Sequence, residues 1–336
     1  MIYLYTFICA FIISFIFSPL MKRIALFYDI LDHPDSPVKT HEKPTPYLGG
    51  IAIWLGFTLS LLAVRFFTNF ETGTLRNLRG IFVAGLIILL IGLYDDLMDL
   101  HFKKKFGWQL VAATVLIMFD MKIKFVQPSY LGIIFTYFWI IAIVNAFNLI
   151  DIMDGLSCGV AVIAALAFFF INAPGESLYV NFAAIALAGA CLGFLPFNWP
   201  KAKMFMGDTG SMFIGLVLAS LSLGSNYTVN NNISVFTPIV VLGIAIYDTL
   251  YIIHKRIEQN KPIFLGSKDH FALRLGKMGW STKKILFVTY TIALLCGVLS
   301  YLITRADVEY AVILYISVLA AGILIAAFLG RVNMDE

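Results

Sequence analysis

Long apolar runs alternate with short polar segments along the whole chain. Such runs are typical of membrane-spanning α-helices, each of which needs about 20 residues to cross the hydrocarbon layer. The strands of a membrane barrel would instead alternate polar and apolar residues. The pattern therefore predicts an all-α polytopic membrane protein, with residues 1–336 in a single integral membrane domain. We expect eleven spans, near residues 2–20, 48–67, 80–94, 107–119, 130–148, 156–171, 182–197, 211–224, 233–253, 284–303 and 309–329.

The composition supports the same class. Of the 336 residues, 60% are hydrophobic and 13% are charged, whereas a soluble domain carries about 25% charged residues. A water-soluble globule is therefore excluded. The first apolar run precedes the basic residues Lys22 and Arg23 instead of following them, so we interpret it as a retained first span and not as a signal peptide.

The basic residues predict the orientation. If the N-terminus lies outside, the inner segments and their edges contain 18 of the 24 Lys and Arg residues. Because Lys and Arg accumulate in cytoplasmic loops, we expect the N-terminus outside and the C-terminus in the cytoplasm. The six basic residues of the outer segments are Arg65, Arg76, Arg79, Lys122, Lys124 and Arg305. The expected surroundings are a lipid bilayer, and we expect no nucleic acid partner.

The polar residues of the predicted inner face concentrate in five segments. They read KPTPYLGG (43–50), DDLMD (95–99), NAFNLIDIMDG (145–155), FMGDTGS (205–211) and KDHFALRL (268–275). Clustered carboxylates repel one another unless a cation or a proton lies between them, and oxygen ligands of this kind suit Mg²⁺ or Mn²⁺. The Lys and Arg residues nearby suit phosphates. Metal-assisted phosphoryl transfer at the membrane surface uses both sets of residues.

Two of these segments allow a structural interpretation as well as a functional one. Asp95 and Asp99 are four residues apart, so on a helix they share a face, although carboxylates can also simply end a helix in water. Asn145, Asn148 and Asp151 are spaced by three residues and form a polar stripe on a helix. That stripe faces a water-filled cleft, or it joins helices by hydrogen bonds.

Two further positions, Asp208 and Asp248, each allow two interpretations. The turn at 207–211 opens into the eighth span, and a helix N-terminus favours an anion or a metal–phosphate unit, yet Asp208 is equally suited to a plain N-terminal cap. In the ninth span, Pro238 and Asp248 predict a broken or tilted helix that borders a groove for a lipid. Asp248 alternatively pairs with a Lys or Arg of another span.

Together and in this order, the five segments resemble the motifs of the polyprenyl-phosphate N-acetylhexosamine-1-phosphate transferases, of the glycosyltransferase 4 type. The resemblance covers residues 43 to 275. It implies a Mg²⁺-dependent transfer of a sugar 1-phosphate, expected to be GlcNAc-1-phosphate, from a UDP-N-acetylhexosamine to a polyprenyl (undecaprenyl) phosphate. UMP leaves, and the lipid-linked sugar serves cell-envelope glycan synthesis. The implied location is the cytoplasmic face of the inner membrane, and a homodimer is left open.

The resemblance also implies roles for individual residues. Asp208 corresponds to the main Mg²⁺ ligand and Asn148 to a second one, with Mn²⁺ as the alternative metal. The implied catalytic residues are Asp95, Asp96, Lys105 and His270. The implied substrate-binding residues are Lys43, Asp151, Asp154, Gly155, Phe205 and Arg274, of which Phe205 stacks on the nucleobase and Asp154 accepts from the uracil N–H.

One departure from the family pattern bears on the substrate. Phospho-MurNAc-pentapeptide transferases carry three consecutive histidines in the last loop, whereas this chain has only His270 there. Asp99 also stands where those enzymes tend to have a lysine. Both features favour the GlcNAc-type branch and leave the pentapeptide enzyme as the alternative. A secondary transporter, the alternative from another class, predicts acids near span centres and an inverted repeat; most acids here lie at inner span ends, and no repeat is evident.

Overall fold

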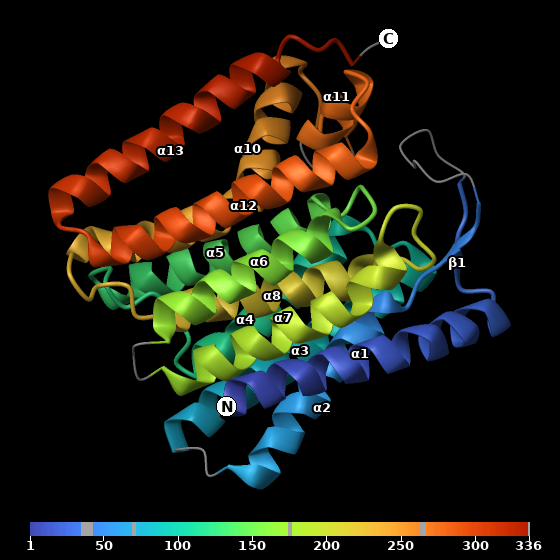
Figure 1. Ribbon diagram of the computed structural model, residues 1–336, viewed down its shortest axis with the longest axis horizontal. Helices are drawn as coiled ribbons and strands as arrows, with labels where there is room; N and C mark the ends of the chain where they lie inside the picture. The colour runs from blue at the N-terminus through green and yellow to red at the C-terminus, as the bar shows by residue number, and fades with distance from the viewer. Residues whose placement is uncertain (35–42, 69–71, 174–176, 263–266, 335–336) are drawn as a thin grey trace.

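Helices make up nearly all of the architecture. A computed structural model describes residues 1–34, 43–68, 72–173, 177–262 and 267–334 (Figure 1). The helices are α1 (Ile2–Phe27), α2 (Gly49–Phe67), α3 (Thr72–Met98), α4 (Phe102–Met118), α5 (Ser129–Leu149), α6 (Leu156–Asn172), α7 (Leu178–Asn198), α8 (Gly207–Gly224), η1 (Asn232–Phe236), α9 (Thr237–Val241), α10 (Gly243–Glu258), α11 (Phe271–Lys277), α12 (Thr282–Arg305) and α13 (Val308–Leu329). Within these ranges the strands are β1 (Leu31–Asp32) and β2 (Thr45–Pro46), which pair antiparallel.

Eight helices in the described part of the chain are long and apolar enough to cross a membrane: α1, α2, α3, α5, α7, α8, α12 and α13. The apolar helices α4 and α6 are shorter, with 17 residues each. Every one of the eleven predicted segments coincides with a helix or with the pair of helices in the ninth segment. The structure therefore confirms an all-α polytopic membrane protein, while the count of eleven spans and the orientation stay predictions.

The ninth segment is broken, as its sequence predicts. The helical stretch of η1 and α9 meets α10 at a bend of 73°. Pro238 lies in the first turn of α9, where its missing N–H costs no helical hydrogen bond. Figure 1 shows the bend, since α10 stands steeply across the neighbouring helices.

Helix α8 is the centre of the bundle. It packs against α2, α3, α5, α6 and α7, and most of its residues are buried. Glycines bring the backbones close: a Cβ on Gly92 of α3 would lie 2.6 Å from the Thr209 Cα, and one on Gly50 of α2 would lie 2.3 Å from the Gly210 nitrogen. Small residues permit such approach between helices in membranes, and here they bring α2 and α3 against the first turn of α8.

The remaining helices surround this centre. Helices α1, α7, α6 and α12 pack in that order, each against the next (Figure 1). Helix α13 is the most apolar candidate span and the least buried one. An apolar helix that leaves its side chains exposed is suited to a lipid environment.

We predict that Gly92→Ala lowers thermal stability in detergent and reduces activity, because the added methyl group meets the backbone of Thr209, which cannot move aside as a flexible side chain can. Overpacking of this kind costs about 1–3 kcal/mol. Gly107→Ala in α4 is the matched control, since nothing lies within 4 Å of a Cβ at that position. An equal melting temperature for both variants would contradict the close packing of α3 on α8.

Candidate active site

Four helix ends meet at one end of the bundle and bring together Asp95, Lys105, Asn148 and Asp208. We call these four residues the carboxylate cluster. Asp95 lies near the end of α3, Lys105 in the first turn of α4, Asn148 at the end of α5 and Asp208 at the start of α8. The four residues come from three of the segments predicted from the sequence and from the lysines that follow the second one. Their meeting is the first requirement of the predicted site.

The Lys105 ammonium group lies between two carboxylates. It forms ion pairs with Asp95 and with Asp208, where Nζ lies 2.5 Å from Oδ2. Asn148 Nδ2 donates to Asp208 Oδ1 at 2.8 Å and to Ser211 Oγ at 3.0 Å. The Asp95 carboxylate is buried, and it also accepts a hydrogen bond from the Leu100 N–H at 2.7 Å. Burial strengthens these charge interactions, and two carboxylates against one ammonium leave a net negative site.

Asp96 has a different environment from Asp95. Its Oδ1 accepts from the Asp208 N–H at 2.7 Å, and its Oδ2 accepts from the N–H and the hydroxyl of Thr209 at 3.1 and 2.6 Å. These N–H groups belong to the first turn of α8, so a carboxylate of α3 caps the helix. The anion predicted for this helix N-terminus is thus supplied by the protein itself, and Asp208 is not the cap.

Glycine is required beside this cap. Gly207 has φ +68°, a backbone conformation that favours glycine. A Cβ there would lie 2.4 Å from Asp96 Oδ2. The Gly-Asp-Thr-Gly-Ser turn therefore has a structural reason for its first glycine: it lets the Asp96 carboxylate reach the helix end and position Asp208.

The expected pairing of Asp95 with Asp99 is wrong. Helix α3 ends at Met98, and Asp99 has φ +49° and is exposed. The shared helix face requires that both residues be helical, which Asp99 is not. The partner that the structure provides for Asp95 is Lys105, ten residues along the chain.

The residues of the predicted polar stripe have different partners in the structure. Asn145 Nδ2 donates to Gln109 Oε1 at 2.7 Å, and Gln109 Nε2 donates back at 3.3 Å, so this pair joins α5 to α4. Asn148, one turn later, is in the carboxylate cluster. Asp151 lies beyond the end of α5 at Leu149, in the following loop. Sequence reasoning missed Gln109, although a glutamine inside an apolar run is a signal of buried hydrogen bonding.

Asp151 is held next to other acids. Burial raises its pKa well above the usual value, and the negative charges of Asp208, Asp96 and Asp154 raise it further. A carboxyl group with a raised pKa at such a position is typical of functional sites. The loop after α5 therefore adds Asp151 to the acids around Asp208, which already include Asp95 and Asp96.

Asp154 and Gly155 hold the loop before α8. Asp154 Oδ2 accepts from the Ala202 N–H at 2.9 Å, and the Gly155 N–H donates to Asn198 Oδ1 at 2.9 Å. The Gly155 carbonyl accepts from the Tyr290 hydroxyl at 2.6 Å. Gly155 has φ +77°, so its place in the motif is explained by backbone conformation. These bonds connect the third segment to the fourth.

The first segment pairs with the fourth. The Phe205 N–H donates to the Pro46 carbonyl at 2.8 Å, and the Phe205 carbonyl accepts from the Gly49 N–H at 3.0 Å. Lys43 lies three residues before Pro46 and is exposed, while the Phe205 side chain is partly exposed. The backbone of Phe205 is thus bonded to the first segment at Pro46 and Gly49. A nucleotide-binding role for Lys43 and Phe205 stays a prediction.

His270 is held by Asp248. The His270 Nδ1 and Asp248 Oδ2 lie 2.7 Å apart, and Asp248 Oδ1 accepts from the Phe271 N–H at 2.9 Å. Asp248 therefore caps α11 and joins it to the broken ninth segment. The expectation that Asp248 pairs with a Lys or Arg of another span is wrong, because its partner is His270 of the last loop.

Arg274 contacts protein groups on several sides. Its guanidinium group forms an ion pair with Asp269 and donates to the carbonyls of Leu329 and Val332 at 3.1 and 2.7 Å. It also lies over the Tyr251 ring. These contacts fasten the end of α13 to α11, which gives this buried arginine a structural role. Its contact with a substrate stays a prediction.

The donor set of the carboxylate cluster fits a divalent cation in its chemistry. Carboxylate oxygens of Asp95 and Asp208 and the amide oxygen of Asn148 are the ligands that Mg²⁺ prefers. Both bonds of Asn148 described above use Nδ2, so neither occupies its oxygen. Across the described ranges, however, no three His, Cys, Asp or Glu side chains are grouped to hold a metal. The Lys105 ammonium forms ion pairs with both carboxylates.

Known proteins are similar to this chain over most of its length. Residues 78–226 match the family described as glycosyl transferase family 4. A probable undecaprenyl-phosphate N-acetylglucosaminyl 1-phosphate transferase of Bacillus subtilis is 32% identical over 97% of this chain and 93% of its own length. The undecaprenyl-phosphate alpha-N-acetylglucosaminyl 1-phosphate transferase of Thermotoga maritima is 30% identical over 82% and 83%. A phospho-N-acetylmuramoyl-pentapeptide-transferase of Staphylococcus epidermidis is 29% identical over 89% and 98%.

We predict that Asp96→Asn destabilises the protein even without substrate. The amide replaces one acceptor oxygen by a donor, so at least one N–H of the first turn of α8 loses its partner, at a cost of about 1–3 kcal/mol. Thermal unfolding in detergent measures this. Asp99→Asn is the control, because that side chain is exposed and outside the helix. If the two variants melt together, Asp96 does not cap α8.

Proposed function

Since the chain belongs to the glycosyl transferase 4 family of polyprenyl-phosphate N-acetylglucosamine-1-phosphate transferases, we propose that it transfers GlcNAc-1-phosphate from UDP-GlcNAc to a polyprenyl phosphate. UMP is the second product, and the lipid-linked sugar enters cell-envelope glycan synthesis. The observation that carries the proposal is the carboxylate cluster, in which the partly exposed ammonium group of Lys105 lies between Asp95 and Asp208. Such a site suits a reaction between two phosphate-bearing substrates.

The main obstacle in this reaction is electrostatic. The acceptor phosphate and the donor diphosphate are both anions, so the site must neutralise charge and align the groups. We propose that Asp208 and Asn148 hold Mg²⁺, with Mn²⁺ as the alternative, while Asp95 contacts the lipid phosphate. When bound, the metal supplies charge neutralisation for the diphosphate. Lys105, from its position between Asp95 and Asp208, neutralises the phosphate groups beside it.

The bond changes follow from the substrates. An oxygen of the lipid phosphate forms a bond to the β-phosphorus of UDP-GlcNAc, and the bond from that phosphorus to the bridging oxygen breaks, so UMP leaves. The attacking phosphate is already mostly ionised near neutral pH, which makes a strong general base unnecessary. Asp95 orients this phosphate or accepts its remaining proton. The alternative is a two-step path in which an aspartate carboxylate attacks first.

The nucleotide is assigned to the edge made by the first and fourth segments. We propose that Phe205 stacks on the uracil, because its partly exposed ring lies directly before the turn that carries Asp208. Lys43 lies two residues before β2, and we propose that it contacts the same substrate. Asp154 and Gly155 support this edge through their bonds to the loop at 198–202.

The proposed setting is a bacterial inner membrane, with eleven spans, the N-terminus outside and the active site on the cytoplasmic face. Support comes from the distribution of basic residues, 18 of 24 of which fall on the side of the carboxylate cluster in this orientation. UDP-sugars are made in the cytoplasm, so the site must open there. A homodimer remains a proposal that cross-linking in native membranes tests.

The decisive assay supplies undecaprenyl phosphate together with radiolabelled UDP-GlcNAc, UDP-GalNAc or UDP-MurNAc-pentapeptide. We expect a labelled lipid from UDP-GlcNAc, and we expect EDTA to abolish it and Mg²⁺ to restore it. Product from UDP-MurNAc-pentapeptide alone would instead assign the chain to the pentapeptide enzymes. Transfer that continues in EDTA would contradict the proposed dependence on a divalent metal.

We predict that Asp95→Asn keeps UDP-GlcNAc binding but lowers turnover by about 10²–10⁴-fold, the range for a positioned proton-transfer group. The amide preserves the shape and removes the charge and basicity. Calorimetry of donor binding in Mg²⁺ and a pH–rate profile separate the two effects. Asp208→Asn is the comparison, since we expect it to lose Mg²⁺-dependent donor binding. Equal loss of donor binding in both variants would make Asp95 chiefly a metal ligand.

We predict that Phe205→Ala weakens UDP-GlcNAc binding by about 1–3 kcal/mol, the range for loss of one aromatic–base stack, and leaves the affinity for the lipid phosphate unchanged. Phe205→Tyr should restore most of the donor affinity because it keeps the ring. The measurement is KM for each substrate. An equal rise in both KM values would indicate that Phe205 only packs the loop.

A further inference from the structure

A second cavity lies at the end of the bundle opposite the carboxylate cluster. Its volume is about 860 Å³, and its walls come from α5, α7, α8, the loop between α4 and α5, and the start of the broken ninth segment. Phe135 of α5 lines it, whereas Asn148 of the same helix is in the carboxylate cluster. Thirteen residues of α-helix separate these positions by roughly 20 Å. The cavity therefore belongs to the other half of the membrane.

One side of the cavity is apolar and reaches the surface of the bundle. Phe135, Phe138, Phe236 and Ile239 line it, and all four are exposed large hydrophobic side chains. In a membrane-spanning bundle, exposed apolar side chains face lipid. The cavity thus opens sideways toward the hydrocarbon layer, and an acyl chain can enter it without leaving an apolar environment.

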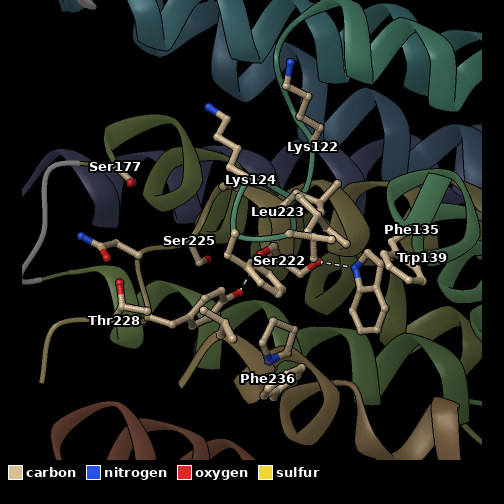
Figure 2. A pocket seen from close by; sticks show the side chains of 18 of the residues that line it. Lys122, Lys124, Phe135, Trp139, Ser177, Ser222, Leu223, Ser225, Thr228 and Phe236 are labelled. Carbon is tan, nitrogen blue, oxygen red and sulfur yellow. Dashed lines mark hydrogen bonds between the residues drawn. The ribbon is translucent and has the colours of Figure 1, made fainter. Parts of the chain in front are cut away.

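The polar atoms of the two aromatic side chains Trp139 and Tyr227 already have partners. Trp139 Nε1 donates to Ser222 Oγ at 2.7 Å, and the Tyr227 hydroxyl donates to the Ser222 carbonyl at 2.9 Å (Figure 2). These bonds hold both aromatic rings in place, so the indole N–H and the phenol O–H need no hydrogen bond from a ligand. The cavity wall therefore presents mainly apolar surface, and an apolar occupant leaves none of these groups unpaired.

The mouth of the cavity is basic. Figure 2 shows the side chains of Lys122 and Lys124 on one side of the cavity and Trp139 and Phe236 on the other. Both ammonium groups share one carboxylate: the Asp120 oxygens lie 3.3 Å from Lys122 Nζ and 2.7 Å from Lys124 Nζ. The hydrogen bond from Lys124 and the nearby Lys122 lower the pKa of Asp120, so it stays ionised. Two ammonium groups against one carboxylate leave a positive charge.

A further basic side chain lies beside this mouth. Arg76 Nη2 donates to the Met118 carbonyl at the end of α4, two residues before Asp120. The cavity therefore combines an apolar wall open to the bilayer with a cationic rim at the end of the helices. A cavity of this size is within the range that encloses a small organic molecule or part of a lipid. An anionic lipid complements both features at once.

We propose that this cavity is a binding site for an anionic phospholipid of the membrane, with the phosphate at Lys122 and Lys124 and an acyl chain against Trp139, Phe135 and Phe236. The site is separate from the carboxylate cluster and from the lipid substrate of the proposed reaction. Its position opposite that cluster assigns it to the leaflet at the other face. The proposal holds whichever sugar the enzyme transfers.

Quenching of Trp139 fluorescence tests the proposal. The full-length protein is reconstituted in nanodiscs of phosphatidylcholine with increasing amounts of phosphatidylglycerol brominated on its acyl chains, and the signal of the Trp139→Phe variant is subtracted. Brominated phosphatidylcholine in otherwise identical discs is the neutral-lipid comparison. We expect quenching of Trp139 at a lower mole fraction of the anionic lipid than of the neutral one.

Variants of Lys122 and Lys124 test whether the charge of these lysines causes the preference for the anionic lipid. Lys122→Gln with Lys124→Gln should raise the mole fraction for half quenching about tenfold, whereas Lys122→Arg with Lys124→Arg should keep it. Lys277→Gln with Lys283→Gln is the matched control, since both lysines are exposed. Lys283 lies in the first turn of α12, and Tyr290 of the same helix contacts Gly155 near the carboxylate cluster. The control therefore removes two positive charges at the other end of the bundle. A melting temperature and a transfer rate close to those of the parent verify that each variant is folded.

Several outcomes would overturn the proposal. Equal quenching by the neutral and anionic lipids would mean that the cavity takes any acyl chain, and the charge would have no role. No quenching by either lipid, together with a dimer in the discs, would mean that a second copy of the chain covers the cavity. A loss of selectivity in the arginine variant would mean that the lysines only support the fold.

Discussion

The carboxylate of Asp96 bonded to the first turn of α8 is the contact from which the site is built. It joins the end of α3 to the start of α8, the central helix of the bundle, and it satisfies N–H groups that a buried helix end otherwise leaves unpaired. Asp208 is the second residue of that turn, so its direction depends on this cap. Gly207 and Gly92 are small because a Cβ at either position would collide with the partner across this contact.

Around this contact, the polar segments provide acid groups, a counter-ion and structural hydrogen bonds. Asp95 and Asp208 provide acid groups, and Lys105 lies between them as their common counter-ion. Asp154 and Gly155 form hydrogen bonds to the segment that leads into α8. The Pro46 carbonyl accepts a hydrogen bond from the Phe205 N–H in the same segment. A site for two anionic substrates needs such support, because the acids and the ammonium group repel or attract one another strongly once they are partly buried.

The two ends of the bundle differ in what they offer to a lipid. At one end, carboxylates and a lysine form a compact polar site suited to phosphate chemistry. At the other end, an apolar cavity with a rim of two lysines and one aspartate is suited to holding a lipid without reacting with it. Helices α5 and α8 line both ends, so the same rigid elements position the cluster and the cavity. Occupancy of the cavity therefore bears on the packing of α8.

The apolar helices and the segments that carry polar residues could be predicted from the sequence, because apolar length and local motifs depend on neighbouring residues alone. Each of the eleven predicted segments is helical, and the ninth is broken at Leu242, four residues after Pro238. Which polar groups meet depends on the tertiary structure. Asp99 leaves the helix, Asn145 pairs with Gln109 while Asn148 reaches Asp208, and Asp248 holds His270. These outcomes depend on where each helix ends and how it is rotated against its neighbours, which spacing along one chain segment does not specify.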